Sequence, residues 1–310
     1  MKKTTKPEDR VIFECVSGSH AYGMNTPESD TDLRGVFVPP LDWCTGFIKR
    51  ESQFSGDSNE DRIIYEIRKF FRMAADANPN ILELLWMPQD CILQFHSSWK
   101  RIQDHRELFL SAKVRHTYTG YAFSQLNRMK RHREWLLNPP ERAPKWSDFG
   151  IPDEDEARQK ITKDIKRLSE AGIDPMKTHG EFVKNSGSYK RAMEIWQHYQ
   201  EWKLNRNPKR AEWEAKFGYD SKHASHLVRL LRQGHEIITT GEVIVRRPDA
   251  KELLAIRNEG IWSYDKLIAY ATEMEEKIKN DAAAETCSLP QKPNRELLNE
   301  LCASIIERFL

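Results

Sequence analysis

One stretch of the chain, from Gly18 to Val36, reads GSHAYGMNTPESDTDLRGV and constrains the fold more than any other. An apolar run from Val11 to Val16 precedes it and predicts a buried strand. The residues from Leu33 to Val38 predict a second strand, and Asp30 and Asp32 stand at its entry. Because side chains alternate across a strand, we expect the two carboxylates on the same face.

Two carboxylates held this close repel each other. The repulsion is relieved by a shared proton or by a hard divalent cation, and Mg²⁺ is typically held by one or two carboxylates together with phosphates and water. Gly18 allows a backbone to approach a ligand closely, and Ser19 offers a hydroxyl and an N–H at a helix start, where an anion is favoured. The stretch therefore predicts a metal-dependent nucleotide site. The simpler alternative is a turn that only caps a strand.

A third strand is predicted from Asp61 to Glu66, leading into an amphipathic helix from Ile67 to Ala77. Asp61 and Glu66 are five residues apart, so on a regular strand they face opposite ways. Only one of them can then join the earlier aspartates. Glu66 has a second explanation, because an acidic residue at a helix N-terminus is favoured by the helix dipole.

A later segment, from Lys222 to Ile237, predicts a helix with one apolar and one polar face. The apolar stripe consists of Ala224, Leu227, Val228 and Leu231, and the polar face carries Lys222, His226, Arg229 and Gln233. Such a polar face is either solvated or available to an anion. Lys222 and Arg229 are the candidate contacts for phosphate groups, and His226 lies beside them on that face.

Composition limits the fold class and the surroundings of the protein. The chain has 310 residues, of which 39% are hydrophobic and 31% charged, and from Ser97 onward its pattern is almost entirely helical. We therefore predict an α+β fold with a small mixed sheet followed by a mostly helical part. A net charge of +2 does not by itself indicate nucleic-acid binding. The five cysteines form no CxxC pair, which predicts reduced thiols and a cytoplasmic protein. No apolar run is long enough to predict a membrane span.

Gly18-Ser19 followed by Asp30-x-Asp32 resembles the signature of the DNA polymerase β-like nucleotidyltransferase superfamily. Further segments resemble one branch of it, the nucleotidyltransferases related to the RNA-repair, RNA-ligase-associated polymerase family. These segments are Arg68-Lys69-Phe70, NPNILELL from Asn78 to Leu85, RNPKRAEWEAKFGYDSKHASHLVRLL from Arg206 to Leu231, and GEVIVRRPDAKELLAIRNEGIWSY from Gly241 to Tyr264.

The resemblance implies a division of the chain and a reaction. Residues 1–96 would form the nucleotidyltransferase core and residues 97–310 a helical domain that completes the nucleotide site, with a charged insertion at about 138–188. The activity implied is transfer of a nucleotidyl group from an NTP such as ATP to a hydroxyl, with release of pyrophosphate. The implied acceptor is an RNA end. A protein hydroxyl is the alternative acceptor, and a non-catalytic NTP-binding module is the alternative function.

The resemblance also implies roles for particular residues. Asp30, Asp32 and Asp61 would be the catalytic and metal-binding carboxylates, with Glu66 as the alternative to Asp61. Two Mg²⁺ ions, replaceable by Mn²⁺, would be held there, and Asp61 would also help to deprotonate the acceptor hydroxyl. The nucleotide would be bound by Gly18, Ser19, Lys222, His226 and Arg229.

Overall fold

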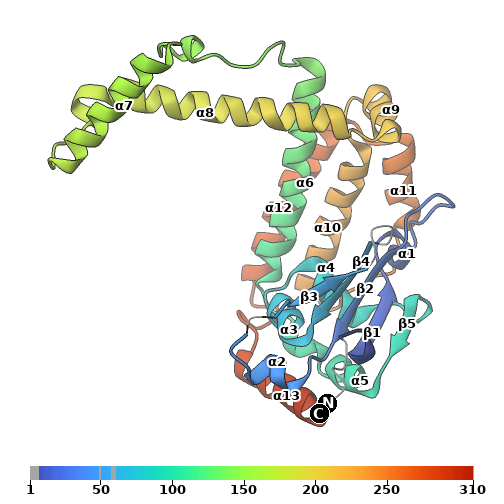
Figure 1. The fold of residues 1–310 in the computed structure, drawn as a ribbon. Helices are drawn as coiled ribbons and strands as arrows, with labels where there is room; N and C mark the ends of the chain where they lie inside the picture. The colour runs from blue at the N-terminus through green and yellow to red at the C-terminus, as the bar shows by residue number, and fades with distance from the viewer. Residues whose placement is uncertain (1–6, 49, 57–60, 310) are drawn as a thin grey trace. The chain divides into compact units, whose positions relative to one another are not determined.

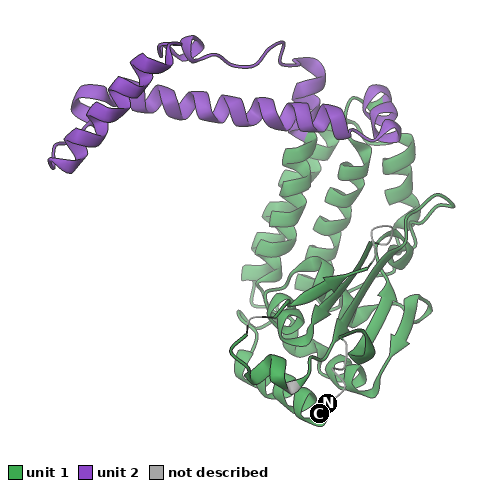
Figure 2. Ribbon diagram, viewed as in Figure 1, with its two compact units in different colours: residues 1–129, 217–310 green, residues 130–216 purple. Residues whose placement is uncertain are grey.

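The computed structural model describes residues 7–48, 50–56 and 61–309. These residues fall into two compact units, shown in different colours in Figure 2. The first unit combines residues 1–129 with residues 217–310, and the second consists of residues 130–216. Two segments far apart in the sequence therefore build the first unit together.

Within the described residues, five strands form one mixed sheet in the order β3-β4-β2-β1-β5. The strands are β1 (Val11–Val16), β2 (Asp32–Phe37), β3 (Gln53–Ser55), β4 (Asp61–Glu66) and β5 (Ile92–Phe95). Strands β2 and β4 run parallel, whereas the other neighbouring strands are antiparallel. The motif stretch runs into the central strand β2, and its residues before Asp32 lie at one end of the sheet (Figure 1).

Short helices accompany the strands. They are α1 (Ser19–Tyr22), α2 (Leu41–Thr45), α3 (Ile67–Ala75), α4 (Pro79–Leu82) and α5 (Ser97–Asp104), with the 3-10 turns η1 (Pro7–Arg10), η2 (Glu83–Trp86), η3 (Gln89–Cys91) and η4 (Arg106–Phe109). Phe13 of β1 stacks on Trp99 of α5 with ring centroids 4.1 Å apart, and Phe70 of α3 lies 5.2 Å from the same indole. The segment after Asn78, which the sequence allowed either to complete the sheet or to pack beneath it, forms α4 and η2 and is buried.

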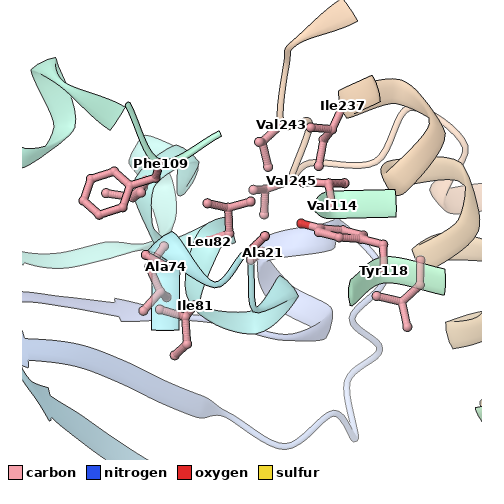
Figure 3. Packing of buried hydrophobic residues seen from close by; sticks show 14 of the residues in the cluster. Ala21, Ala74, Ile81, Leu82, Phe109, Val114, Tyr118, Ile237, Val243 and Val245 are labelled. Carbon is pink, nitrogen blue, oxygen red and sulfur yellow. The ribbon is translucent and has the colours of Figure 1, made fainter. Parts of the chain in front are cut away.

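The rest of the first unit is helical. It contains the N-terminal part of α6 (Val114–Leu137), α10 (Ser221–Thr240), α11 (Ala250–Glu259), α12 (Tyr264–Ala283) and α13 (Arg295–Phe309). Helix α10 contacts both α11 and α12, and it lies close to α6, because a Cβ on Gly234 would come within 2.8 Å of Tyr118. Figure 3 shows that residues of α1, α4, α6 and α10 share one hydrophobic cluster. The helices and the sheet thus have a common core.

The second unit is helical too. It contains the 3-10 turn η5 (Trp146–Phe149), α7 (Asp155–Glu170), α8 (Met176–Asn205) and most of α9 (Pro208–Phe217). Aromatic rings hold it together: Trp135 lies 5.4 Å from Trp202, and Trp146 stacks on Tyr189 at 3.6 Å. The predicted charged insertion at about 138–188 falls inside this unit.

The predicted α+β fold class is confirmed, because a mixed sheet near the N-terminus is followed by a mostly helical region. The functional division at residue 96 stays a prediction, since the compact units separate at other positions. Among the residues that the structure describes, every helix is too short or too polar to span a lipid bilayer.

Candidate active site

Backbone pairing brings two aspartates together at one end of the sheet. Asp32 is the first residue of β2 and Asp61 the first residue of β4. The two strands are parallel, and their register places Asp32 directly opposite Asp61. Residues opposite each other in neighbouring strands project to the same face of the sheet, so the two carboxylates meet.

The two carboxylates share a hydrogen bond, and its effect on their pKa values is opposite. The pKa of Asp32 is raised above the ordinary carboxyl value, first by burial and then by the hydrogen bond with Asp61. The pKa of Asp61 is lowered, first by that hydrogen bond and then by one from Arg34. Asp32 is therefore the more readily protonated carboxyl of the two, and Asp61 the more readily ionised. The repulsion between neighbouring carboxylates is relieved by a proton or by a hard divalent cation, so the donor set fits such a cation.

Gly18 packs against the Asp32 carboxylate. Its φ of 64° lies in the left-handed region, and a Cβ at this position would come within 2.4 Å of Asp32 Oδ2. The preceding residue fixes the backbone, because Ser17 donates its N–H and its hydroxyl to the Asp32 carbonyl oxygen at 2.8 and 3.1 Å. The glycine is required here by the close approach of Asp32 as well as by its own φ. Ser19 follows as the first residue of α1.

Arg34 is a part of the site that the sequence analysis did not include. Its Nη1 lies 3.0 Å from Asp61 Oδ1 and donates to the Asp61 carbonyl oxygen at 2.7 Å, while its Nη2 lies 3.9 Å from Asp32. The sequence could have indicated this role, because side chains alternate along a strand and Arg34, two residues after Asp32, shares its face. Arg34 holds the Asp61 carboxylate in place and keeps it ionised.

The structure separates the two alternatives for the third carboxylate. Glu66 lies at the far end of β4 from Asp61, and its buried carboxylate accepts hydrogen bonds from the N–H groups of Arg68 and Lys69 at 3.1 and 3.3 Å. It therefore caps α3 and is also paired with the Arg68 side chain at 2.9 Å. Asp30 is exposed and lies two residues before β2.

Lys222 and His226 lie in the first two turns of α10. The positive charge of Lys222 acts on Asp32, where it opposes the rise in pKa that burial causes. The pKa of His226 is lowered well below its usual value, first by burial and then by the charges of Arg229 and Lys222. Both causes disfavour the protonated form of His226, so its ring is neutral at pH 7.

Arg229 requires a correction. We expected it on an open polar face, but its side chain is 4% exposed and its Nη1 donates to Glu83 Oε1 at 2.8 Å. Its guanidinium lies over the Tyr22 ring, 3.9 Å from the centroid, and the Tyr22 hydroxyl donates to Glu83 Oε2 at 2.7 Å. Gln233, on the same predicted face, is buried as well. Arg229 is thus neutralised inside the protein and is not open to a triphosphate.

Comparison with known proteins points to the family that the motif resembles. Residues 2–139 match the model of the RNA repair pathway DNA polymerase beta family, RlaP. The chain is 28% identical over 280 residues to an uncharacterized 38.9 kDa protein from the nrdC-mobD intergenic region of Enterobacteria phage T4, covering 80% of this chain and 82% of the phage protein. It is 29% identical over 86 residues to the uncharacterized protein YcgL of Bacillus subtilis (strain 168), covering 27% and 32% of the two chains. No solved structure matches it significantly.

Proposed function

We propose that the protein transfers a nucleotidyl group from an NTP to a hydroxyl at an RNA end, on the premise that residues 2–139 match the model of the RNA repair pathway DNA polymerase beta family. Pyrophosphate is the second product. The observation that carries the proposal is the pairing of Asp32 with Asp61 on parallel strands, backed by the Gly18 backbone.

Asp30, Asp32 and Asp61 are the residues that would hold the divalent cations, with Mg²⁺ as the cation we propose. When bound, the cations polarise the phosphate group and stabilise the charge on the attacking and leaving oxygens. Asp61 has a lowered pKa and an Arg34 partner, so it is a poor proton acceptor, and its role is to hold the cation.

Lys222, His226 and Ser19 are the residues that we propose for the triphosphate. Lys222 supplies a positive charge that acts on Asp32. His226 is neutral, so one ring nitrogen carries a proton that it can donate to a phosphate oxygen. The N–H and hydroxyl of Ser19 stand beside the Gly18 turn. Arg229 is left out of this set, because Glu83 already neutralises it.

The acceptor is proposed from the family and from charge. The family belongs to RNA repair, and α6 carries the basic residues Arg128, Lys130, Arg131 and Arg133 near its C-terminal end. Basic side chains on a helix surface bind the phosphates of a nucleic acid. A protein hydroxyl as acceptor is an outcome that the experiment distinguishes.

The test is an incubation with each of the four NTPs labelled at the α-phosphate, with Mg²⁺ or with EDTA. The acceptors are an oligoribonucleotide with a 3′-hydroxyl, the same strand with a 3′-phosphate, and a mixture of cell proteins. We expect Mg²⁺-dependent labelling of the 3′-hydroxyl strand alone, and no labelling by the Asp32→Asn variant. If protein becomes labelled and neither RNA strand does, the acceptor is a protein hydroxyl and not an RNA end. If no label is transferred from any NTP, the proposal is contradicted.

A further inference from the structure

A pocket of about 780 Å³ opens at the end of the sheet opposite to the aspartate pair. Strands β2 and β4 run side by side from Asp32 and Asp61 to Phe37 and Glu66, and Glu66 lines this pocket. A strand of six residues spans about 17 Å. The pocket is therefore a separate site, formed by α2, the segment after it, α3 and α13.

Arginines dominate the charge of this pocket. Arg50, Arg68, Arg72 and Arg295 line it, with Glu51 and Glu66 as the acidic residues. The Glu66 carboxylate already caps α3 and pairs with Arg68, and Arg295 pairs with Asp76 outside the pocket. In the part of the chain that the structure describes, no carboxylate forms an ion pair with Arg50 or Arg72: Arg72 donates to the Arg68 carbonyl oxygen, and Arg50 lies over the Trp43 ring. Two guanidinium groups are thus available to an anion.

Aromatic and apolar side chains line the same pocket. Phe47 is 98% exposed and its neighbour Ile48 is 54% exposed, so both side chains present apolar surface to the pocket opening. The Trp43 ring has the Arg50 guanidinium 5.7 Å from its centroid. The buried Phe71 and Leu298 close the inner side. A flat ring and an anionic group can both be accommodated.

We infer that this pocket binds a nucleoside phosphate, with its phosphate on Arg50 and Arg72 and its base against Phe47 and Trp43. Guanidinium groups match the geometry of phosphate oxygens, and aromatic side chains stack on nucleobases of any sequence. The pocket also has the volume typical of small-molecule sites. The ligand is either a free nucleotide or one nucleotide unit of a single-stranded RNA. The inference does not require the proposed transfer reaction.

The test measures the binding of a 5′-phosphorylated tetraribonucleotide, labelled with fluorescein at its 3′ end, by fluorescence anisotropy in EDTA. EDTA removes divalent cations, so the aspartate pair cannot bind the phosphate of the probe through a metal ion. Arg72→Ala should weaken binding about tenfold, the value of one charge-assisted phosphate contact. Phe47→Ala should weaken it about fivefold or more through lost stacking. Both side chains are exposed, so both variants should melt like the wild type.

The matched control is Arg308→Ala, which removes an exposed arginine of α13 that does not line the pocket. Competition identifies the source: displacement by AMP supports a free nucleotide, whereas displacement only by unlabelled tetranucleotide supports an RNA strand. The inference is overturned if the wild type does not bind the probe. It is also overturned if Arg72→Ala and Phe47→Ala bind as the wild type does, or if Arg308→Ala loses as much.

Discussion

Asp32 and Asp61 influence each other, because the hydrogen bond between them adds to the effect of burial in raising the pKa of Asp32 and is the main cause of the lowered pKa of Asp61. Arg34 adds a positive charge next to this pair, 3.0 Å from Asp61. An amide in place of the Asp32 carboxyl keeps a donor for Asp61 but cannot replace an anionic oxygen ligand. The fold therefore depends on the hydrogen bond that the Asp32 side chain makes, whereas cation binding depends on its negative charge.

The aspartates and Glu66 should respond differently to conversion into amides. Asp32→Asn and Asp61→Asn should each lower nucleotidyl transfer by about two to three orders of magnitude, because a lost cation contact costs several kcal/mol in the transition state. Glu66→Gln should leave transfer little changed and lower stability by about 1 kcal/mol through the weakened cap. Single-turnover rates and urea unfolding of the variants measure this. The reverse order of activities would assign the third carboxylate to Glu66.

His226 should make stability depend on pH. Its folded-state pKa is lowered well below 6.5, first by burial, so the unfolded chain binds a proton that the folded protein excludes. The free energy of unfolding should therefore fall as the pH drops below about 6.5, with a slope approaching 1.4 kcal/mol per pH unit from this residue. His226→Gln should flatten the slope. The exposed His198 is the matched control, and an equal effect of His198→Gln would refute the assignment.

At the residue scale, spacing along one strand predicted Asp30 and Asp32 on a shared face, but β2 begins only at Asp32 and Asp30 lies outside it. The opposition of Asp32 and Asp61 depends on the register between two strands that are not consecutive in the chain. That register is a property of the folded sheet. Arg34 was missed because its partner Asp61 comes from the other strand.

Helix α10 is the element that departs most from its sequence pattern. The predicted stripe of Ala224, Leu227, Val228 and Leu231 is buried, as expected. On the opposite face Arg229 and Gln233 are buried as well, whereas Lys222 and His226 are partly exposed. Periodicity identifies the apolar face but does not reveal a buried ion pair on the polar one. Glu83 of η2, which contacts both Arg229 and Tyr22, thereby connects α10 to α1.

Breaking this buried pair should cost stability. Arg229→Ala leaves the Glu83 carboxylate buried without its cation, so the free energy of unfolding should fall by about 3–5 kcal/mol. The double variant Glu83→Gln with Arg229→Met should recover part of the loss, because no buried charge remains. The comparison is Lys100→Ala, which breaks the exposed pair with Asp104 on α5 and should cost about 1 kcal/mol or less. Equal losses in urea unfolding of the Arg229 and Lys100 variants would contradict this account.

On the scale of the whole molecule, the family match and the compact unit do not coincide. The match covers residues 2–139, whereas the first unit also contains residues 217–310. Leu227 of α10 and Leu267 of α12 are fully buried in the same core as the residues that cover the sheet. The sequence predicted a mixed sheet followed by helices, but sharing one core is a long-range property that no local pattern reports.

A fragment of residues 1–139 should therefore fail to unfold cooperatively, because it lacks the helices that complete its core. Residues 1–129 joined to residues 217–310 by a flexible linker should keep a cooperative thermal transition, since they contain the complete unit. Circular dichroism melts of the two proteins give the comparison. If the 1–139 fragment alone shows a cooperative transition, its core is complete without residues 217–310 and this account is contradicted.

The central claim is that Asp32 and Asp61 hold a divalent cation, and the most direct measurement is Mn²⁺ binding followed by electron paramagnetic resonance. We expect the wild type and Glu66→Gln to bind Mn²⁺ with similar affinity in the presence of a non-hydrolysable NTP. Asp32→Asn and Asp61→Asn should each weaken this binding by at least about tenfold, the effect of losing one charged oxygen ligand. If both aspartate variants bind Mn²⁺ as tightly as the wild type, the pair is not the metal site and the account is wrong.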